Sequence, residues 1–129
     1  MTGSGDGEMR LWAVRGATKV ARNDASQIVD ATEELMRELL SRNELEADRI
    51  VSCIFTCTHD LNAEFPAVAA RKLGLDAVPL LCGQEIDVPN SMRSVVRVLV
   101  HYYAPVDHAP AHTYLGEAQG LRSDLSAAQ

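Results

Sequence analysis

The stretch that decides the fold is PLLCGQEIDV, residues Pro79–Val88, followed by VVRVLV, residues Val95–Val100. Both stretches contain valine- and leucine-rich runs, which are typical of strands, and a polar turn lies between them. The second run carries a single arginine, Arg97. Burying a guanidinium is costly unless an anion meets it. Arg97 therefore lies either on a solvated strand face or in a site for a negatively charged partner.

Two helices are expected before this stretch. In Asp24–Arg42, an aspartate followed three residues later by Gln27 forms a capping-box pattern, and apolar residues recur at helical spacing. A shorter helix is expected over Asn62–Leu73, with Pro66 in its first turn. Five further runs are typical of strands: Met9–Arg15, Arg49–Cys57, Ala77–Cys82, Val95–Tyr103 and Thr113–Leu121. A turn is expected at Gly16–Thr18, directly after the first of these runs.

The order of these elements is strand, helix, strand, helix, strand, strand, strand. It predicts an α+β fold in which a five-stranded mixed sheet carries its helices on one face. Nothing in the chain is left to cover the other face. Exposed apolar surface of this kind favours a closed homo-oligomer in which the sheets pack inward.

Composition narrows the class of protein. A length of 129 residues fits one domain, and the net charge of −6 argues against nucleic acid or an anionic membrane as partners. There is neither an apolar run of about 18 residues nor a signal-peptide pattern, so a cytoplasmic location is expected. Residues 1–8 are expected to form a disordered extension. The three cysteines predict reduced thiols, and the spacing of Cys53 and Cys57 suits a metal poorly.

One adjacent pair, His59 and Asp60, has the residue types of general acid–base chemistry. Neighbouring residues at a strand end usually point apart, and both types suit turns. The turn interpretation is therefore favoured for this pair.

Several segments taken together resemble the monofunctional, trimeric class of chorismate mutase. These segments are RGAT (Arg15–Thr18), DLNAEFPA (Asp60–Ala67) and VPLLCGQEIDV (Val78–Val88). They are followed by Arg97, by Tyr114 and by LRSDL (Leu121–Leu125). The resemblance runs from Met9 to about Ser126. It implies a ferredoxin-like chain that assembles into a homotrimeric pseudo-α/β-barrel with active sites between subunits. The implied domain is 9–122, followed by a flexible tail, 123–129.

The resemblance also implies a reaction: the intramolecular Claisen rearrangement of chorismate to prephenate, a step towards phenylalanine and tyrosine. This rearrangement needs no proton transfer, covalent intermediate, metal or cofactor. The enzyme must hold a dianion in a compact conformer and stabilise charge as an ether bond breaks. Cationic donors and shape are therefore expected in the site, without a nucleophile–base pair.

Carried over position by position, the resemblance gives three catalytic residues. Arg97 would meet the ether oxygen, Glu85 would bind the substrate hydroxyl and orient Arg97, and Arg15 would bind a carboxylate across the subunit interface. Tyr114 would donate to a carboxylate, and the backbone near Cys82 would bind the hydroxyl. The pocket would be shaped by Phe65, Ala67, Leu80, Leu81 and Leu121, with Arg71, Arg122 and a mobile tail at its mouth.

Two positions depart from the family pattern. Val68 stands where a lysine is often found, so one charge at the rim is missing, and Leu81 stands where a threonine is familiar. Two other functions remain open. One is a trimeric enamine/imine deaminase-like enzyme, which would also place an arginine at an intersubunit cleft. The other is a non-catalytic trimer that senses a carboxylate of the aromatic pathway.

Overall fold

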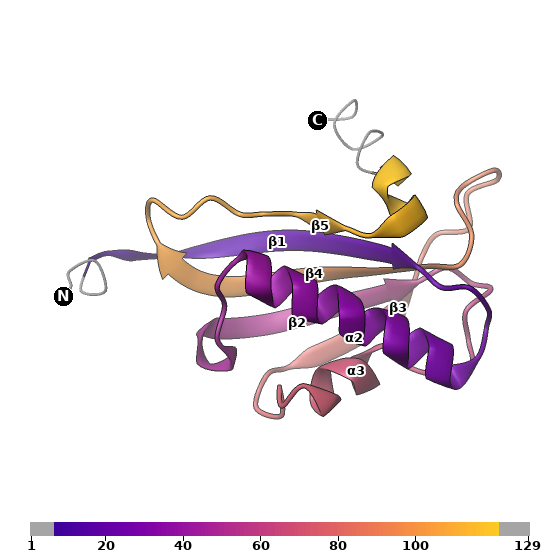
Figure 1. Cartoon of the computed structure of the whole chain (residues 1–129), viewed down its shortest axis with the longest axis horizontal. Helices are drawn as coiled ribbons and strands as arrows, with labels where there is room; N and C mark the ends of the chain where they lie inside the picture. The colour runs from indigo at the N-terminus through magenta and orange to yellow at the C-terminus, as the bar shows by residue number, and fades with distance from the viewer. Residues whose placement is uncertain (1–6, 122–129) are drawn as a thin grey trace.

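The fold is a mixed five-stranded sheet with helices packed on one face (Figure 1). The computed structural model describes residues 7–121, so Arg122, the predicted tail and most of the predicted N-terminal extension lie outside the described residues. Its elements run in the predicted order: β1 (Met9–Lys19), α2 (Ala25–Arg42), the 3₁₀ turn η1 (Ala47–Arg49), β2 (Ile50–Cys57), α3 (Ala67–Lys72), β3 (Leu80–Gln84), β4 (Val95–Pro105), β5 (Thr113–Tyr114) and the 3₁₀ turn η2 (Gly116–Ala118).

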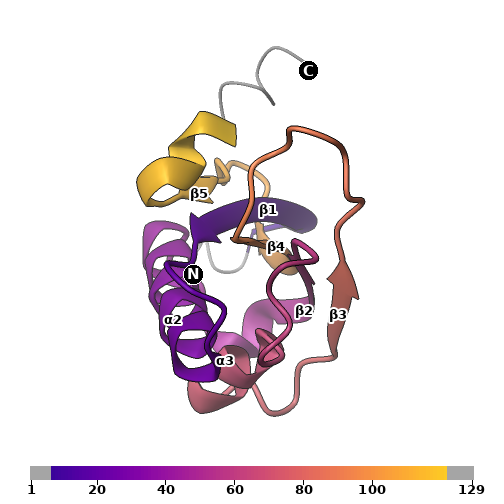
Figure 2. The same ribbon diagram turned by 90° about the vertical axis from the view of Figure 1, so that its right-hand side faces the viewer.

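The strands lie in the order β3-β2-β4-β1-β5. Strand β4 pairs antiparallel with both β1 and β2, whereas β2 with β3 and β1 with β5 pair in parallel. Figure 2 shows α2 and α3 on the same side of this sheet. The predicted α+β class, with a mixed sheet and helices on one face, is confirmed.

Alternation along β4 separates the two faces of the sheet. Val98, Val100 and Tyr102 are buried in the core beneath the helices. Arg97 and Leu99, which alternate with them, are only partly buried. They face the side of the sheet that carries no α-helix, which we call the open face. Exposed apolar residues on this face come from three strands: Leu11, Leu81 and Tyr103.

Helix α2 begins and ends where its sequence indicates. The Asp24 carboxylate accepts a hydrogen bond of 3.1 Å from the Gln27 backbone N–H, as a capping residue does, and the helix ends at Arg42. Behind it, the Asn43 side chain donates to the carbonyl of Leu39 and accepts from the backbone N–H of Ala111 at 2.8 Å. This contact fastens the end of α2 to the segment that leads into β5.

Four predicted bounds were wrong. The turn at Gly16–Thr18 is absent because β1 continues to Lys19, paired with β4 throughout. Helix α3 covers only Ala67–Lys72, since the stretch before Pro66 is held in an irregular turn in which Asn23 accepts the backbone N–H groups of Asn62 and Ala63.

The other two corrections concern β3 and β5. Strand β3 begins at Leu80, after Pro79, which has no N–H for the ladder, and it extends to Gln84 at the edge of the sheet. Strand β5 is limited to Thr113–Tyr114, because the chain turns into η2 at Gly116, where φ is +55°. Of the helices between residues 7 and 121, none combines the length and the apolar character of a membrane span.

Candidate active site

The centre of the candidate site is an ion pair between Arg97 and Glu85. The Nε atom of Arg97 lies 3.3 Å from Oε2 of Glu85, and the two side chains are 40% and 28% exposed. The Nε atom itself is buried, and no group among the described residues is aligned to accept a hydrogen bond from it. The contact with Glu85 is therefore electrostatic, and the exposed part of the guanidinium remains available to an anion.

Glu85 is held from two sides. The hydroxyl of Thr56 donates to the same Oε2 atom at 2.5 Å, and the backbone N–H of Glu85 donates to the carbonyl of Cys57 at 2.8 Å. Both contacts come from β2, the strand between β3 and β4. Because its backbone and its carboxylate are both fixed, Glu85 offers Arg97 a stationary charge.

Arg97 belongs to a row of residues that crosses the whole sheet. Gly83 pairs with Thr56, Thr56 with Arg97, Arg97 with Ala17, and Ala17 with Tyr114. Paired residues on neighbouring strands project to the same face, so this row lies on the open face. Ala17, which lies between Arg97 and Tyr114, is fully buried.

Arg15 lies in the next row on the same face. It pairs with Leu99, which pairs with Ile54, which in turn pairs with Leu81. The backbone N–H of Arg15 donates to Nδ1 of His112 at 3.0 Å, which joins β1 to the segment before β5. Four predicted site residues therefore lie on the open face: Arg15 from β1, Leu81 from β3, Glu85 directly after β3, and Arg97 from β4.

Tyr114 is buried, with 7% of its surface exposed. It packs with Ala17, Val95 and Leu121 in a small apolar cluster. This cluster fixes the tyrosine at the β5 edge of the sheet, away from the β3 edge that carries Glu85.

Phe65 and Cys82 line a pocket of about 380 Å³ between the ends of β2 and β3 and the start of α3. Phe65 is 68% exposed, so a large aromatic face meets solvent at the pocket rim. A pocket of this size with an exposed aromatic side chain at its rim suits a small organic molecule.

Other predicted site residues lie apart from this pocket. Leu80 packs against the core on the helix side, and Ala67 is buried within that core. Arg71 is an exposed residue of α3. Arg122 is outside the described residues. The structure therefore brings together Arg97 and Glu85, and separately Tyr114 and Leu121, while Ala67 and Leu80 serve packing.

The cysteines next to the site are not activated. Burial raises the pKa of the Cys53 thiol to about 12 and that of Cys57 to about 11. Thiols in this state are poor nucleophiles. Among the described residues, no group of three His, Cys, Asp or Glu side chains is placed to hold a metal ion.

Sequence reasoning missed two residues of this region, Thr56 and Asp60. Thr56 could have been found from strand alternation, since it lies on the opposite face from the buried Cys53, Phe55 and Cys57. Asp60 was interpreted as a turn residue, but its carboxylate also accepts two hydrogen bonds from Ser94, which precedes β4.

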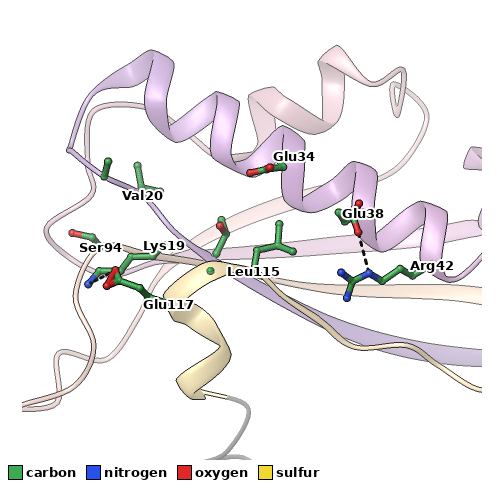
Figure 3. A pocket seen from close by; sticks show the side chains of 11 residues that line it. Lys19, Val20, Glu34, Glu38, Arg42, Ser94, Leu115 and Glu117 are labelled. Atoms are coloured by element: carbon green, nitrogen blue, oxygen red, sulfur yellow. Dashed lines mark hydrogen bonds and ion pairs between the residues drawn. The ribbon is translucent and has the colours of Figure 1, made fainter.

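A larger cavity of about 810 Å³ lies between α2 and η2 (Figure 3). Its cations are already paired: Lys19 lies 3.3 Å from Glu117, and Arg42 lies 3.0 Å from Glu38. Glu34 adds a third carboxylate. The excess of negative charge makes this cavity unsuitable for a dianion.

Comparison with known proteins agrees with this geometry. The family model for chorismate mutase type I matches residues 11–125. The chain belongs to the chorismate mutase type I family. The predicted family and the predicted enzyme class, an isomerase of the chorismate mutase type, are thereby confirmed.

Individual relatives agree as well. Chorismate mutase AroH of Thermus thermophilus is 41% identical over 119 residues, which is 90% of this chain and 97% of the relative. Chorismate mutase AroH of Bacillus subtilis is 34% identical over 120 residues, covering 92% and 94% of the two chains. A solved chorismate mutase from Clostridium thermocellum superposes with a TM-score of 0.80 at 45% identity, covering 84% of this chain and 98% of that one.

Proposed function

We propose that the chain converts chorismate to prephenate, with Arg97 stabilising the negative charge that develops on the ether oxygen. The observation that carries this proposal is the ion pair between Arg97 and Glu85 on the open face. A fixed guanidinium of this kind acts on charge that appears only in the transition state, so it lowers the barrier instead of merely tightening binding.

The other site residues restrain the substrate. Glu85 accepts a hydrogen bond from the substrate hydroxyl while it holds Arg97, and Phe65 and Leu81 provide apolar walls. Chorismate carries two carboxylates, and Arg15 and Tyr114 each bind carboxylate oxygen. Holding the dianion in its compact conformer turns a rare reactive geometry into the bound one.

We further propose a homotrimer, in which the open face of each sheet packs against its neighbours. The support is physical: Leu11, Leu81 and Tyr103 are 48%, 64% and 47% exposed on that face. Apolar surface of this extent is costly in water and favours association. Arg15 and Tyr114 of one chain then complete the site of Arg97 and Glu85 on the next. Sedimentation equilibrium at micromolar concentration tests the assembly, and a stable folded monomer would contradict it.

The domain is proposed to span residues 9–122, with residues 123–129 and Arg122 closing over the site as a lid. A cytoplasmic enzyme of phenylalanine and tyrosine biosynthesis is the corresponding cellular proposal. Removing the residues after Leu121 tests the lid, because a lid that holds substrate raises KM more than it lowers kcat when it is lost.

The decisive experiment follows the near-ultraviolet absorbance of chorismate after the purified protein is added. We expect the absorbance to fall and prephenate to accumulate. A deaminase-like enzyme would leave chorismate intact and release ammonia from an enamine. A carboxylate sensor would bind chorismate, as calorimetry would report, without consuming it. Either result would overturn the proposed reaction.

A further inference from the structure

The residue immediately before β4, Ser94, has a strained backbone. Its φ is +60°, in the left-handed region that residues with a side chain seldom occupy. Such strain persists only when the surroundings enforce it, and it often occurs beside functional sites. Ser94 lies three residues before Arg97, which belongs to β4.

The group that enforces this conformation is the carboxylate of Asp60. Its Oδ1 atom accepts the backbone N–H of Ser94 at 3.3 Å, and its Oδ2 atom accepts the Ser94 hydroxyl at 2.8 Å. Burial opposes ionisation of Asp60, but hydrogen bonds from Thr58 and Ser94 outweigh burial and lower its pKa to about 2. The carboxylate is therefore charged at neutral pH, when both hydrogen bonds are strongest.

Neighbouring contacts carry this constraint into the sheet. The carbonyl of Ser94 accepts the backbone N–H of Val20 at 2.7 Å. Val95 exchanges two hydrogen bonds of 3.0 Å with Thr58, one to its hydroxyl and one from its backbone N–H. The start of β4 is thus tied to the end of β1 and to the end of β2.

The same turn ends the connection that links the two central residues of the site. Glu85 and Arg97 stand at opposite ends of the connection from β3 to β4. Within this connection Ile86 is 82% exposed and Val88 is 52% exposed, so the loop has little packing of its own. The contact between Asp60 and Ser94 fixes this connection at its far end, just before β4 begins.

We infer that Asp60 is a positioning residue for Arg97: it holds Ser94 in the left-handed conformation and so aligns the start of β4 with Glu85. This inference rests on the proposed function, because its consequence for turnover depends on Arg97 acting on the substrate. Without the Asp60 carboxylate, Ser94 relaxes, and the guanidinium shifts relative to the developing charge.

The test compares Asp60→Ala with Asp24→Ala. Asp24 is a chemically matched control, because its carboxylate also accepts one serine hydroxyl, from Ser26 at 2.6 Å, and one backbone N–H, from Gln27 at 3.1 Å. It caps α2, far along the chain from the site. We expect D60A to lower kcat roughly tenfold to a hundredfold with a smaller change in KM, since small misplacements of catalytic groups have effects of this size. D24A should keep the wild-type kcat. Circular dichroism at the assay temperature gives the folded fraction of each variant.

Repeating D60A in a protein that already carries Ser94→Gly distinguishes a positioning role of Asp60 from a general loss of stability. Glycine adopts the left-handed conformation without strain, so Ser94→Gly reduces the need for the clamp. The loss of kcat caused by D60A should therefore be smaller in S94G than in the wild-type protein. Asp60→Asn, which keeps one acceptor oxygen, should recover part of the D60A loss.

The outcomes distinguish the two proposals. A wild-type protein that does not consume chorismate would overturn the proposed function, and this inference with it. An active wild-type protein whose kcat is equal in D60A and D24A would overturn the inference alone. The inference would also be overturned if D60A lowered kcat by the same factor in the S94G protein and in the wild-type protein.

Discussion

Arg97 and Tyr114 lie opposite the same residue, Ala17, one on each side of strand β1. Two strand spacings separate them, which is about 10 Å across the sheet. Tyr114 is also buried against Leu121 and cannot swing towards Arg97 without opening that cluster. The proposed trimer accommodates this separation, because in it the two residues of one chain serve different sites.

Replacing Arg97 tests the centre of the site. Arg97→Ala should lower kcat by about a hundredfold to a thousandfold, since one preorganised donor to developing charge contributes roughly 3–4 kcal/mol. Arg97→Lys should also be poor, because an ammonium cannot reproduce the fork of a guanidinium. The measurement is steady-state turnover of chorismate. Arg37→Ala is the control, because Arg37 also pairs with a carboxylate, that of Glu33 at 2.7 Å, on the outer face of α2. Wild-type kcat in R97A would contradict the role of this arginine.

Glu85 and Thr56 should both affect kcat through Arg97, and replacing Glu85 should lower kcat more than replacing Thr56. Glu85→Gln keeps the shape but removes the charge, so kcat should fall by about tenfold or more, as expected for a charge-assisted contact of roughly 1.5–3 kcal/mol. Thr56→Val removes only the hydroxyl that Glu85 accepts and should cost less, about 1 kcal/mol. Thr32→Val, which removes a buried hydroxyl from α2, is the control for stability. A larger kcat loss in T56V than in E85Q would refute this order.

The sequence predicted the class of fold because the spacing of apolar residues and the order of helices and strands can be recognised without knowledge of tertiary contacts. The helix starting at Asp24 and the buried alternation around Arg97 depend on local spacing, and both are present. The errors arose where tertiary contacts override local signals. Gly16 was read as a turn, yet it is the place where β1 passes beneath α2.

Prediction of the site had a similar limit. The pairing of Arg97 with Glu85 follows from a family pattern, and the ion pair is present. The roles of Thr56 and Asp60 depend on strand register and on one strained turn, neither of which a single sequence specifies. Leu80 and Ala67 were assigned to the pocket by the family resemblance; in this chain Ala67 is buried in the core and Leu80 packs against it.

Two strand glycines, Gly16 in β1 and Gly83 in β3, should respond oppositely to alanine. A Cβ atom at Gly16 would lie 3.0 Å from the Thr113 carbonyl oxygen and 3.0 Å from Leu39 Cδ1, whereas a Cβ atom at Gly83 meets nothing within 4 Å. Gly16→Ala should therefore destabilise the protein by about 1–3 kcal/mol and displace β5. Gly83→Ala should be neutral or slightly stabilising, because it restricts the unfolded chain. Urea denaturation measures both changes, and equal effects would contradict the packing described for Gly16.

Asp60 should also make the free energy of unfolding depend on pH in the acid range. Its pKa is lowered from 3.8 to about 2, so the charged carboxylate stabilises the fold fully above about pH 4. That stabilisation is lost as the pH falls from 4 through 2, when the carboxylate becomes protonated. We expect wild type to exceed Asp60→Asn in unfolding free energy by about 1–2 kcal/mol at pH 5, after allowance for solvent screening. The difference should shrink steadily towards pH 2. Urea titrations at several pH values measure it, and a constant difference from pH 5 to pH 2 would show that the charge of Asp60 does not hold the turn at Ser94.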